Sequence, residues 1–427
     1  NCYNIGYSSA TSESAKLGSI VGGGISARMS SCYYDSTLTS PTGDITLRPF
    51  GCVALSTVEM TDSDSYKGFN FKTVWNIIPD ENYVYPQLKI NPHIGVGETE
   101  NIRDFAGGCG TFENPYKIMT PGQLDNVRKY PGSTFMLLND IDMNQYCRNN
   151  EFAPIGDSLF GFYGTFMGEG HKISNLTITS DEQGGLFGLN NGEIYNLDLE
   201  NISFTSGIAG GIACVNTGLI YMSSVTYALE MEGKNVMLGG IASSNKIGGM
   251  VISCGINGQI TLGGNNVYFG GIAYNNMGII AGSYNNCEFI SEKSNYLTAG
   301  GITTSNSGTV SDCIAYANMY IDPYSESVAG GISAVSTGSI VNSICTASKL
   351  TARQSGGICA YYNSGKIYNC YFRNELSRPT FEGEVNDVYK LTDEELCNPL
   401  NFNELDTDSM WYMEEGMYPV LIEAFLL

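Results

Sequence analysis

The sequence predicts an all-β protein built as a parallel β-helix, a solenoid in which short strands wind into coils that stack on one another. Three observations predict this fold class: one phrase recurs seven times, its copies follow one another at 26 to 31 residues, and its aligned positions each keep one chemical character. The phrase is two glycines, an aliphatic residue, a short polar stretch, a glycine, and then Ile or Val. Its glycine pairs begin at Gly184, Gly210, Gly239, Gly270, Gly300, Gly330 and Gly356.

Two aligned positions of the phrase admit only aliphatic residues. One follows the glycine pair and the other follows the later glycine. In the four middle copies they are Ile241, Ile272, Ile302 and Ile332, and Val251, Ile280, Val310 and Ile340. Short β-branched runs broken by Gly and Asn are typical of strands, and no long helical periodicity is present. We therefore expect each aliphatic position to form an interior column, repeated at about 4.8 Å from coil to coil.

Two further columns carry small or polar residues. Asn190, Asn216, Asn245, Asn276 and Asn306 share one position. We expect it to lie in turns, where Asn tolerates left-handed backbone and stacked amides can bond to each other. Cys254, Cys313 and Cys370 alternate with Ser in the other column, which predicts buried thiols. Outside the repeats, Cys109 and Cys147 are the pair best placed by sequence to form a disulfide.

Other repeat folds fit this sequence less well. A leucine-rich repeat would show a Leu-x-x-Leu-x-Leu pattern, which is absent, and a propeller blade needs roughly 40 residues or more. The length of 427 residues suits a rod that grows by adding coils.

The composition excludes several classes of partner. With 43 acidic and 21 basic residues, the formal charge of −22 disfavours nucleic acid and anionic membrane surfaces. No apolar run approaches the ~20 residues of a membrane-spanning helix. The N-terminal segment lacks the features of a signal peptide, so we expect a mature form or an excised fragment.

The chain is expected to hold two arrays. Residues 1–88 are the end of a first β-helix array with its C-terminal tail, 89–104 are a linker, and 105–427 are a second array. Within the second array, residues 105–183 form N-terminal coils with a short helix at 121–130, residues 184–370 form the repeats, and residues 371–427 form a tail.

Each tail has a tryptophan that precedes a Tyr-Pro pair, at Trp75 and at Trp411. Because a solenoid must cover its last open coil, we expect both tails to be capping segments that pack over the ends of their arrays. Acidic pairs in the two tails, Asp62 with Asp64 and Asp406 with Asp408, are expected to form equivalent turns.

The order of motifs in the second array resembles a known family. GTFENPYKI, LLNDIDM, FYGTFMGEGHKISNLTI and GGLFGLNNGEIYNL follow one another as in bacterial surface proteins with the GLUG repeat. These are adhesin-like, filamentous-haemagglutinin-like proteins, and the repeat also accompanies some IgA-cleaving proteases. The resemblance implies a right-handed β-helix, secretion or cell-surface display, and adhesion. Here Met167 and Gly168 replace the family's usual Asp-Gly, which puts any role of that Asp in doubt.

One segment offers a metal-binding hypothesis. Asp140, Asp142 and Asn144 have the spacing that begins a calcium loop, although Gln145 replaces the expected glycine and no Glu closes the loop. The alternative is a strand end whose aspartates cap neighbouring turns. Calcium is thus the one metal to consider, and no other cofactor is expected.

No catalytic constellation is predicted. The acidic residues of the coils occupy no common column, and the two histidines, His93 and His171, have no recognisable nucleophile or second ligand beside them. The glycine pairs are not phosphate loops, because no Lys-Ser/Thr follows them.

Tyrosines near the end of the second array form the candidate ligand site: Tyr361, Tyr362, Tyr368 and Tyr371. Aromatic side chains favour interfaces, but they also serve to seal the end of a rod. Both interpretations stay open at this point.

The function predicted is a non-enzymatic, secreted or cell-surface, adhesin-like binding or scaffold module. Its partner would be an extracellular glycan or a host protein. Two alternatives remain: a carbohydrate-active β-helix enzyme, either a polysaccharide lyase or a glycoside hydrolase, and a passive stalk of a larger surface protein. A cluster of carboxylates on one face would favour the enzyme.

Overall fold

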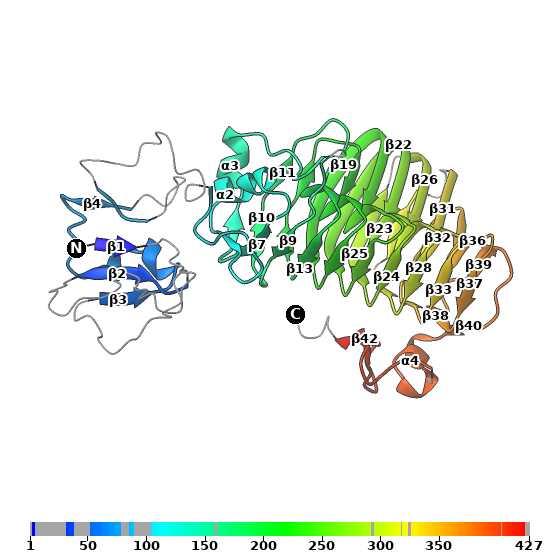
Figure 1. Ribbon diagram of the computed structural model, residues 1–427. Coiled ribbons are helices and arrows are strands. Elements are labelled where there is room, and N and C mark those ends of the chain that lie inside the picture. The colour runs from blue at the N-terminus through cyan, green and yellow to red at the C-terminus, as the bar shows by residue number, and fades with distance from the viewer. Residues whose placement is uncertain are drawn as a thin grey trace. The chain divides into compact units, whose positions relative to one another are not determined.

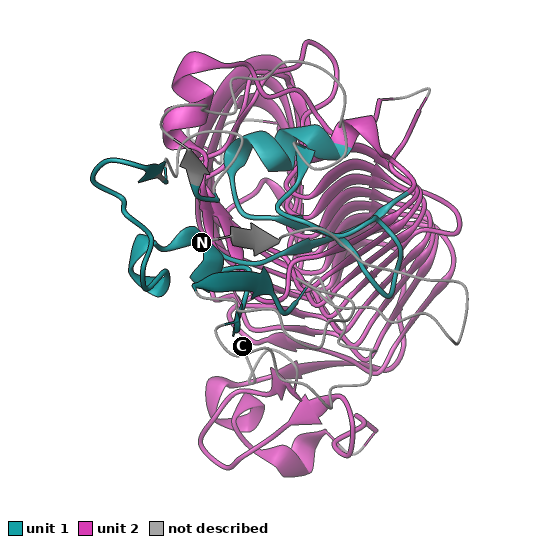
Figure 2. Cartoon of the chain, turned by 60° about the vertical axis from the view of Figure 1, so that its left-hand side comes forward, with its two compact units in different colours: residues 1–127, 133–139 teal, residues 128–132, 140–427 magenta. Residues whose placement is uncertain are grey.

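The computed structural model describes residues 2–4, 31–37, 52–77, 85–88, 104–157, 160–291, 294–316, 318–322, 326–402 and 404–422. The chain divides into two compact units, residues 1–127 with 133–139 and residues 128–132 with 140–427 (Figure 2). The predicted linker at 89–104 lies, except for its last residue, outside the described residues.

Unit 2 is a parallel β-helix, as the repeats predict. Its strands form three sheets that run along the stack of coils (Figure 1). The fifteen-stranded sheet contains β8 (Ile141–Asp142), β10 (Lys172–Ser174), β14 (Asp198–Glu200), β16 (Ile208–Gly210), β19 (Ser224–Gly239), β22 (Gly255–Gly270), β25 (Tyr284–Ser291), β26 (Ser294–Gly300), β29 (Ile314–Ala315), β30 (Met319–Ile321), β31 (Glu326–Gly330), β34 (Ile344–Cys345), β35 (Gln354–Gly356), β38 (Cys370–Arg373) and β40 (Val388–Leu391).

The eight-stranded sheet contains β12 (Phe187–Asn190), β17 (Ala213–Asn216), β20 (Ala242–Asn245), β23 (Ala273–Asn276), β27 (Thr303–Asn306), β32 (Ser333–Ser336), β36 (Cys359–Tyr362) and β39 (Thr380–Glu382). Within unit 2 the third sheet contains β9 (Thr165–Met167), β13 (Glu193–Tyr195), β18 (Leu219–Tyr221), β21 (Met250–Ile252), β24 (Ile279–Ala281), β28 (Thr309–Ser311), β33 (Ser339–Val341) and β37 (Lys366–Tyr368). A short pair, β11 (Thr177–Ile178) with β15 (Ser203–Phe204), and helix α3 (Asn144–Asn149) accompany the first coils.

The predicted interior columns are confirmed. All eight aliphatic residues of the four middle copies are fully buried, and the Val251 column pairs in register from strand to strand. Cys254, Cys313 and Cys370 are likewise buried thiols. Burial raises the pKa of Cys370 to about 12, so this sulfur stays protonated and acts as a small apolar group.

The asparagine column forms a buried amide ladder. Each Nδ2 donates to the Oδ1 of the next coil at 2.8–2.9 Å, from Asn190 through Asn306. The ladder was predicted, but its place in left-handed turns was wrong, because these asparagines end the strands of the eight-stranded sheet. The left-handed backbone lies in a different column, which includes Asn196, Asp312 and Asn342, each with φ near 50°.

The glycine pairs let neighbouring coils approach closely at the corner between two sheets. A Cβ added to Gly301 would lie 1.9 Å from the carbonyl oxygen of Gly331 and 2.8 Å from the Ala315 methyl. A Cβ on Gly271 would meet the Gly301 carbonyl in the same way. In the five pairs from Gly211 to Gly331, the second glycine is therefore required by contact with the next coil.

The C-terminal tail of unit 2 lies along the side of the coils (Figure 1). It contains α4 (Asp393–Leu396), η4 (Pro399–Asn401), β41 (Trp411–Tyr412) and the antiparallel β42 (Val420–Leu421). Trp411 is fully buried in a cluster with Ile314, Ile344 and Tyr371, which belong to three successive coils. The expected position over the open end is therefore wrong: the tail covers apolar side chains that point outward from the fifteen-stranded sheet.

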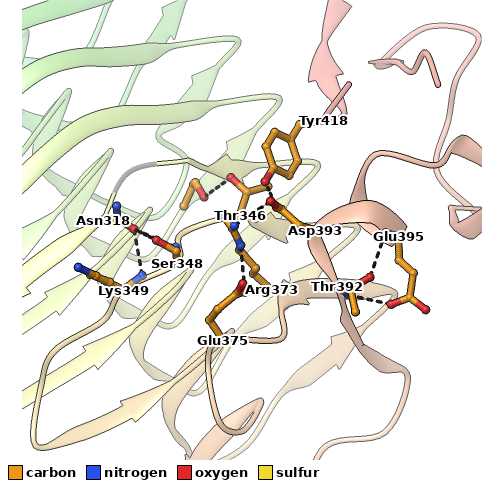
Figure 3. A network of polar contacts seen from close by, with 11 residues as sticks. Asn318, Thr346, Ser348, Lys349, Arg373, Glu375, Thr392, Asp393, Glu395 and Tyr418 are labelled. Carbon is orange, nitrogen blue, oxygen red and sulfur yellow. Dashed lines mark hydrogen bonds and ion pairs between the residues drawn. The ribbon is translucent and has the colours of Figure 1, made fainter. Parts of the chain in front are cut away.

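Polar contacts hold this tail in place (Figure 3). Arg373 of β38 bonds to Glu375 and, at 2.8 Å, to Asp393 of α4, which also accepts a hydrogen bond from the Tyr418 hydroxyl. Burial and the bond to Asp393 raise the pKa of Tyr418 to about 12. Thr392 and Glu395 form a capping box that starts the helix.

Asp312 is expected to make docking of the tail sensitive to pH. Its carboxylate accepts from Asn342 at 3.1 Å and from the Trp411 indole at 3.4 Å, and burial raises its pKa. Since the folded pKa is raised, the stabilising effect of this group is complete below the pKa of an unfolded aspartate, about 3.9, and is lost as pH rises through the folded pKa.

We expect the docked tail of Asp312→Asn to keep its stability at neutral pH, because Asn has no charge to bury. Asn also keeps an oxygen that accepts from the Trp411 indole, and it tolerates the left-handed backbone at this position. Hydrogen exchange of residues 392–422 between pH 4 and 7 checks this. The difference in protection between parent and variant should grow with pH. A difference that stays constant over that range would contradict the assignment.

Unit 1 repeats this plan in part. The strands β1 (Cys2–Asn4), β2 (Cys32–Asp35) and β3 (Cys52–Leu55) pair in parallel, and η1 (Glu59–Thr61) and η2 (Ser63–Ser65) follow them. Trp75 of β4 (Trp75–Asn76) pairs with Leu88 of β5 (Gln87–Leu88), as Trp411 pairs with Leu421. The same unit holds β6 (Tyr116–Ile118), its parallel partner β7 (Thr134–Leu137), and α2 (Pro121–Asn126) in the predicted helical segment.

The two tails use equivalent turns, but at other residues than predicted. Asn70 Oδ1 accepts from two following backbone amides and its carbonyl accepts from the Trp75 amide. Asp406 does the same before Trp411. Asp62 forms a separate turn by accepting from the Asp64 amide. The equivalent of Asp406 is therefore Asn70.

Candidate functional site

A depression of about 360 Å³ lies on the outer face of the fifteen-stranded sheet, where β22, β26, β31 and β35 run side by side. Figure 1 shows β22, β26 and β31 as neighbouring strands. It is called the tyrosine groove below. Its lining residues are Asn266, Tyr268, Tyr296, Thr298, Glu326, Val328 and Gln354.

The strand register arranges these residues in two rows across the strands. Asn266, Tyr296 and Glu326 are partners on successive coils and form the first row. The second row lies two residues further along each strand and contains Tyr268, Thr298, Val328 and Gln354. Side chains two apart on a strand share a face, so both rows point outward.

Two tyrosines give the groove its apolar surface. Tyr296 is 55% exposed, and Tyr268 is half-buried with its ring centroid 5.5 Å from that of Tyr274 on the adjoining β23. Burial and the neighbouring Tyr268 raise the pKa of Tyr274, so its phenol is neutral at physiological pH. The groove thus presents two aromatic rings, with the Tyr274 ring packed beside that of Tyr268.

Hydrogen-bonding groups surround the rings. The Asn266 amide donates to Asn235 Oδ1 of the preceding coil at 2.8 Å, which holds this side chain in one orientation. Glu326 is exposed, and Thr298 and Gln354 are half-buried beside it on the next strands. Glu326 is the one acidic residue among the seven that line the groove.

The tyrosines predicted as the ligand site are not brought together by the structure. Tyr371 is 4% exposed and lies under the tail, packed on Tyr389 and Phe402. Its assignment to a binding surface was wrong, because the tail covers it. Tyr361 and Tyr362 belong to β36 of the eight-stranded sheet, and Tyr368 belongs to β37 of the third sheet.

The aspartates predicted to bind calcium serve local structure. Asp142 accepts from the Asn144 amide and from Asn175 Nδ2, both at 2.9 Å, at the start of α3. Asp140 accepts from the Lys172 amide at 3.0 Å and lies 3.4 Å from His171 Nδ1. These bonds lower the pKa of both carboxyls. Within the described ranges no cluster of three His, Cys, Asp or Glu side chains is placed to hold a metal.

Cys109 and Cys147 are both thiols, so the predicted disulfide is not formed. The Cys109 sulfur contacts Thr111 and Asn114, and the Cys147 thiol donates to the Thr177 carbonyl at 3.8 Å.

The tyrosine groove was not predicted from the sequence, because its residues lie before each glycine pair and outside the repeated phrase. Its two rows stand two and four residues before each pair, at positions where the residue type changes from coil to coil. The signal in the sequence is the presence of Tyr268 and Tyr296 at these outward positions. They lie on neighbouring coils, Tyr268 two and Tyr296 four residues before the glycine pair.

Comparison with known proteins gives partial likenesses. No family model matches the chain, so membership of the GLUG-repeat family stays a prediction. A "Putative Gly-rich membrane protein" of Evansella cellulosilytica is 44% identical over 103 residues, which are 22% of this chain and 12% of that relative. The matched stretch therefore spans about an eighth of that protein's length. None of the helices in the described ranges has the length and apolar character of a membrane span.

Two solved structures resemble this chain in part. A "putative immunoglobulin A1 protease" from Bacteroides ovatus is 20% identical with a TM-score of 0.49, over 75% of this chain and 96% of that chain. An "IgA1 Protease" is 14% identical with a TM-score of 0.42, over 65% of this chain and 22% of that chain. Neither likeness is close enough to carry a statement about activity.

Proposed function

We propose that this chain is a non-catalytic binding module, secreted or displayed on a cell surface, whose tyrosine groove binds carbohydrate. One observation carries the proposal: two outward tyrosine rings stand among amide, hydroxyl and carboxylate groups in one depression. Sugars present an apolar C–H face that stacks on aromatic rings, and hydroxyls that bond to planar polar groups. A few polar groups set around an apolar surface are what a small-molecule site requires.

Binding without cleavage fits the groove better than hydrolysis. A glycosidase needs two carboxyl groups roughly 5–9.5 Å apart across the scissile bond. Glu326 is the single carboxylate in the lining, and its neighbours in the rows are Tyr296, Val328 and Thr298. The same shortage disfavours a lyase, which needs a base and a charge stabiliser beside the sugar.

Titration of the purified chain with a panel of neutral and acidic glycans tests this function. For a glycan that binds, we expect Tyr296→Ala and Tyr268→Ala each to weaken affinity about tenfold, equivalent to about 1.4 kcal/mol, because each removes a stacking surface. Tyr195→Ala is the matched control, since Tyr195 is a half-buried tyrosine on β13 of the third sheet.

Three outcomes would overturn the proposal. The first is binding that resists both groove substitutions, which would place the ligand elsewhere. The second is release of reducing or unsaturated ends from the bound glycan that is abolished by Glu326→Gln, which would make the chain an enzyme. The third is binding of host proteins without binding of any glycan, which would replace carbohydrate as the partner.

A further inference from the structure

We propose that the ligand of the tyrosine groove is a linear, uncharged glycan that lies along the coil axis and contacts successive coils with successive sugar residues. This inference rests on the proposed function and adds the ligand's direction, length and charge. It follows from the register of the lining residues.

The direction follows from where the contacts are. Along any one strand, the groove offers at most two outward side chains, such as Tyr296 and Thr298 on β26, before the glycine pair turns the chain. Across the strands, by contrast, the first row continues over β22, β26 and β31, and the second row continues over these strands and β35. A ligand that follows the axis therefore meets all seven lining residues, whereas one that follows a strand meets two.

The length follows from the spacing of the coils. Four neighbouring strands at about 4.8 Å span roughly 14 Å. An extended β-1,4-linked pyranose chain advances by about one such spacing per sugar. The groove thus offers contacts for roughly three consecutive sugars, each set beside one or two side chains of a coil.

The two ends of the groove differ in chemistry. At the β22 end, the Tyr268 ring and the oriented Asn266 amide stand together, and Tyr296 follows on the next coil. At the β35 end, Gln354 is the remaining contact. A short ligand is therefore expected to occupy the aromatic end, and a longer one to extend toward Gln354.

The charge follows from the lining and from the whole chain. Glu326 lies in the first row, and none of the seven lining residues is Lys or Arg. The chain carries a formal charge of −22, so a uronic acid or sialic acid polymer would approach a repulsive field.

The experiment is a calorimetric titration with β-1,4-linked glucose and N-acetylglucosamine oligosaccharides, from the monosaccharide to the hexasaccharide. Oligogalacturonides of equal length serve as charged probes. We expect affinity to rise with each residue up to about the trisaccharide and then to level off, since the groove spans about three coil spacings. Oligogalacturonides should bind at least tenfold more weakly, and Glu326→Gln should narrow that difference.

Substitutions at the two ends test the direction. Tyr296→Ala should lower the affinity for the disaccharide and for the tetrasaccharide by the same factor. Gln354→Ala should lower the affinity for the tetrasaccharide but leave the affinity for the disaccharide unchanged. Tyr195→Ala is the control and should change neither affinity. An equal effect of Gln354→Ala on both lengths would overturn the axial arrangement.

The possible failures are distinguishable. Affinity that is independent of chain length but lost in Tyr296→Ala would overturn the axial ligand and leave carbohydrate binding in place. Tighter binding of oligogalacturonides than of the neutral oligosaccharides would overturn the claim that the ligand is uncharged. No binding by any saccharide would overturn this inference together with the proposed function.

Discussion

Replacing Trp411 by Ala should release the C-terminal tail from the coils at a cost of about 3–5 kcal/mol, the range for truncating a buried aromatic side chain. The ring is fully buried among Ile314, Ile344 and Tyr371, and its indole N–H donates to Asp312. The substitution removes the contacts of the ring and leaves a cavity over three coils.

Hydrogen exchange and limited proteolysis are the measurements for this variant. Amides of residues 392–422 should lose protection, while those of the buried coil strands keep theirs, because each coil of a solenoid depends mainly on its neighbours. Tyr412→Ala is the control, since Tyr412 is the next residue and is 38% exposed. Protection of the tail equal to that of the parent would show that Trp411 does not hold it.

Replacing Gly301 by Ala should destabilise the coils by about 3 kcal/mol or more, the upper range for forcing an extra methyl into a packed interior. The new Cβ would lie 1.9 Å from the Gly331 carbonyl oxygen, and backbone cannot rotate away as a side chain can. Two coils would have to separate, which would weaken the hydrogen bonds between them.

Chemical denaturation followed by circular dichroism checks this expectation. The control is Gly263→Ala in β22, where the nearest atom to an added Cβ is Glu232 Cγ at 3.6 Å. That variant should stay within about 0.5 kcal/mol of the parent. Equal midpoints for Gly301→Ala and the parent would mean that the coils can part without cost.

The interior of the molecule was predictable because stacking gives every coil the same environment. Ile272 and Ile302 occupy one position of successive coils and so carry the same residue type, as do the ladder asparagines. Identity within a column identifies what is buried. Identity within a column does not give the backbone conformation at that position. For this reason the left-handed turns were predicted at the asparagine ladder, whereas the structure has them at the column of Asn196.

The outer surface was less predictable because outward positions vary freely from coil to coil. Tyr268 aligns with Thr298 and Val328, so no column identity marks the tyrosine groove. Tyr371 resembled an exposed binding residue by its position near the end of the array, but long-range docking of the tail buries it. Such docking depends on segments far apart in the chain, which a local pattern does not encode.

Because the coils stack in register, the chain can lose or gain one whole coil and keep the register of the remaining strands. Removing residues 271–300 would join Gly270 to Gly301 and so restore a glycine pair. Asn245 would then face Asn306 in the amide ladder, and Ile241 would precede Ile302 in the core. Loss or gain of one such unit should therefore shorten or lengthen the stack of coils without breaking its interior. Because Tyr296 lies within that segment, the same change would delete a wall of the tyrosine groove. Under the proposed function, chains with different numbers of coils would therefore share one scaffold and differ in the glycan that they bind.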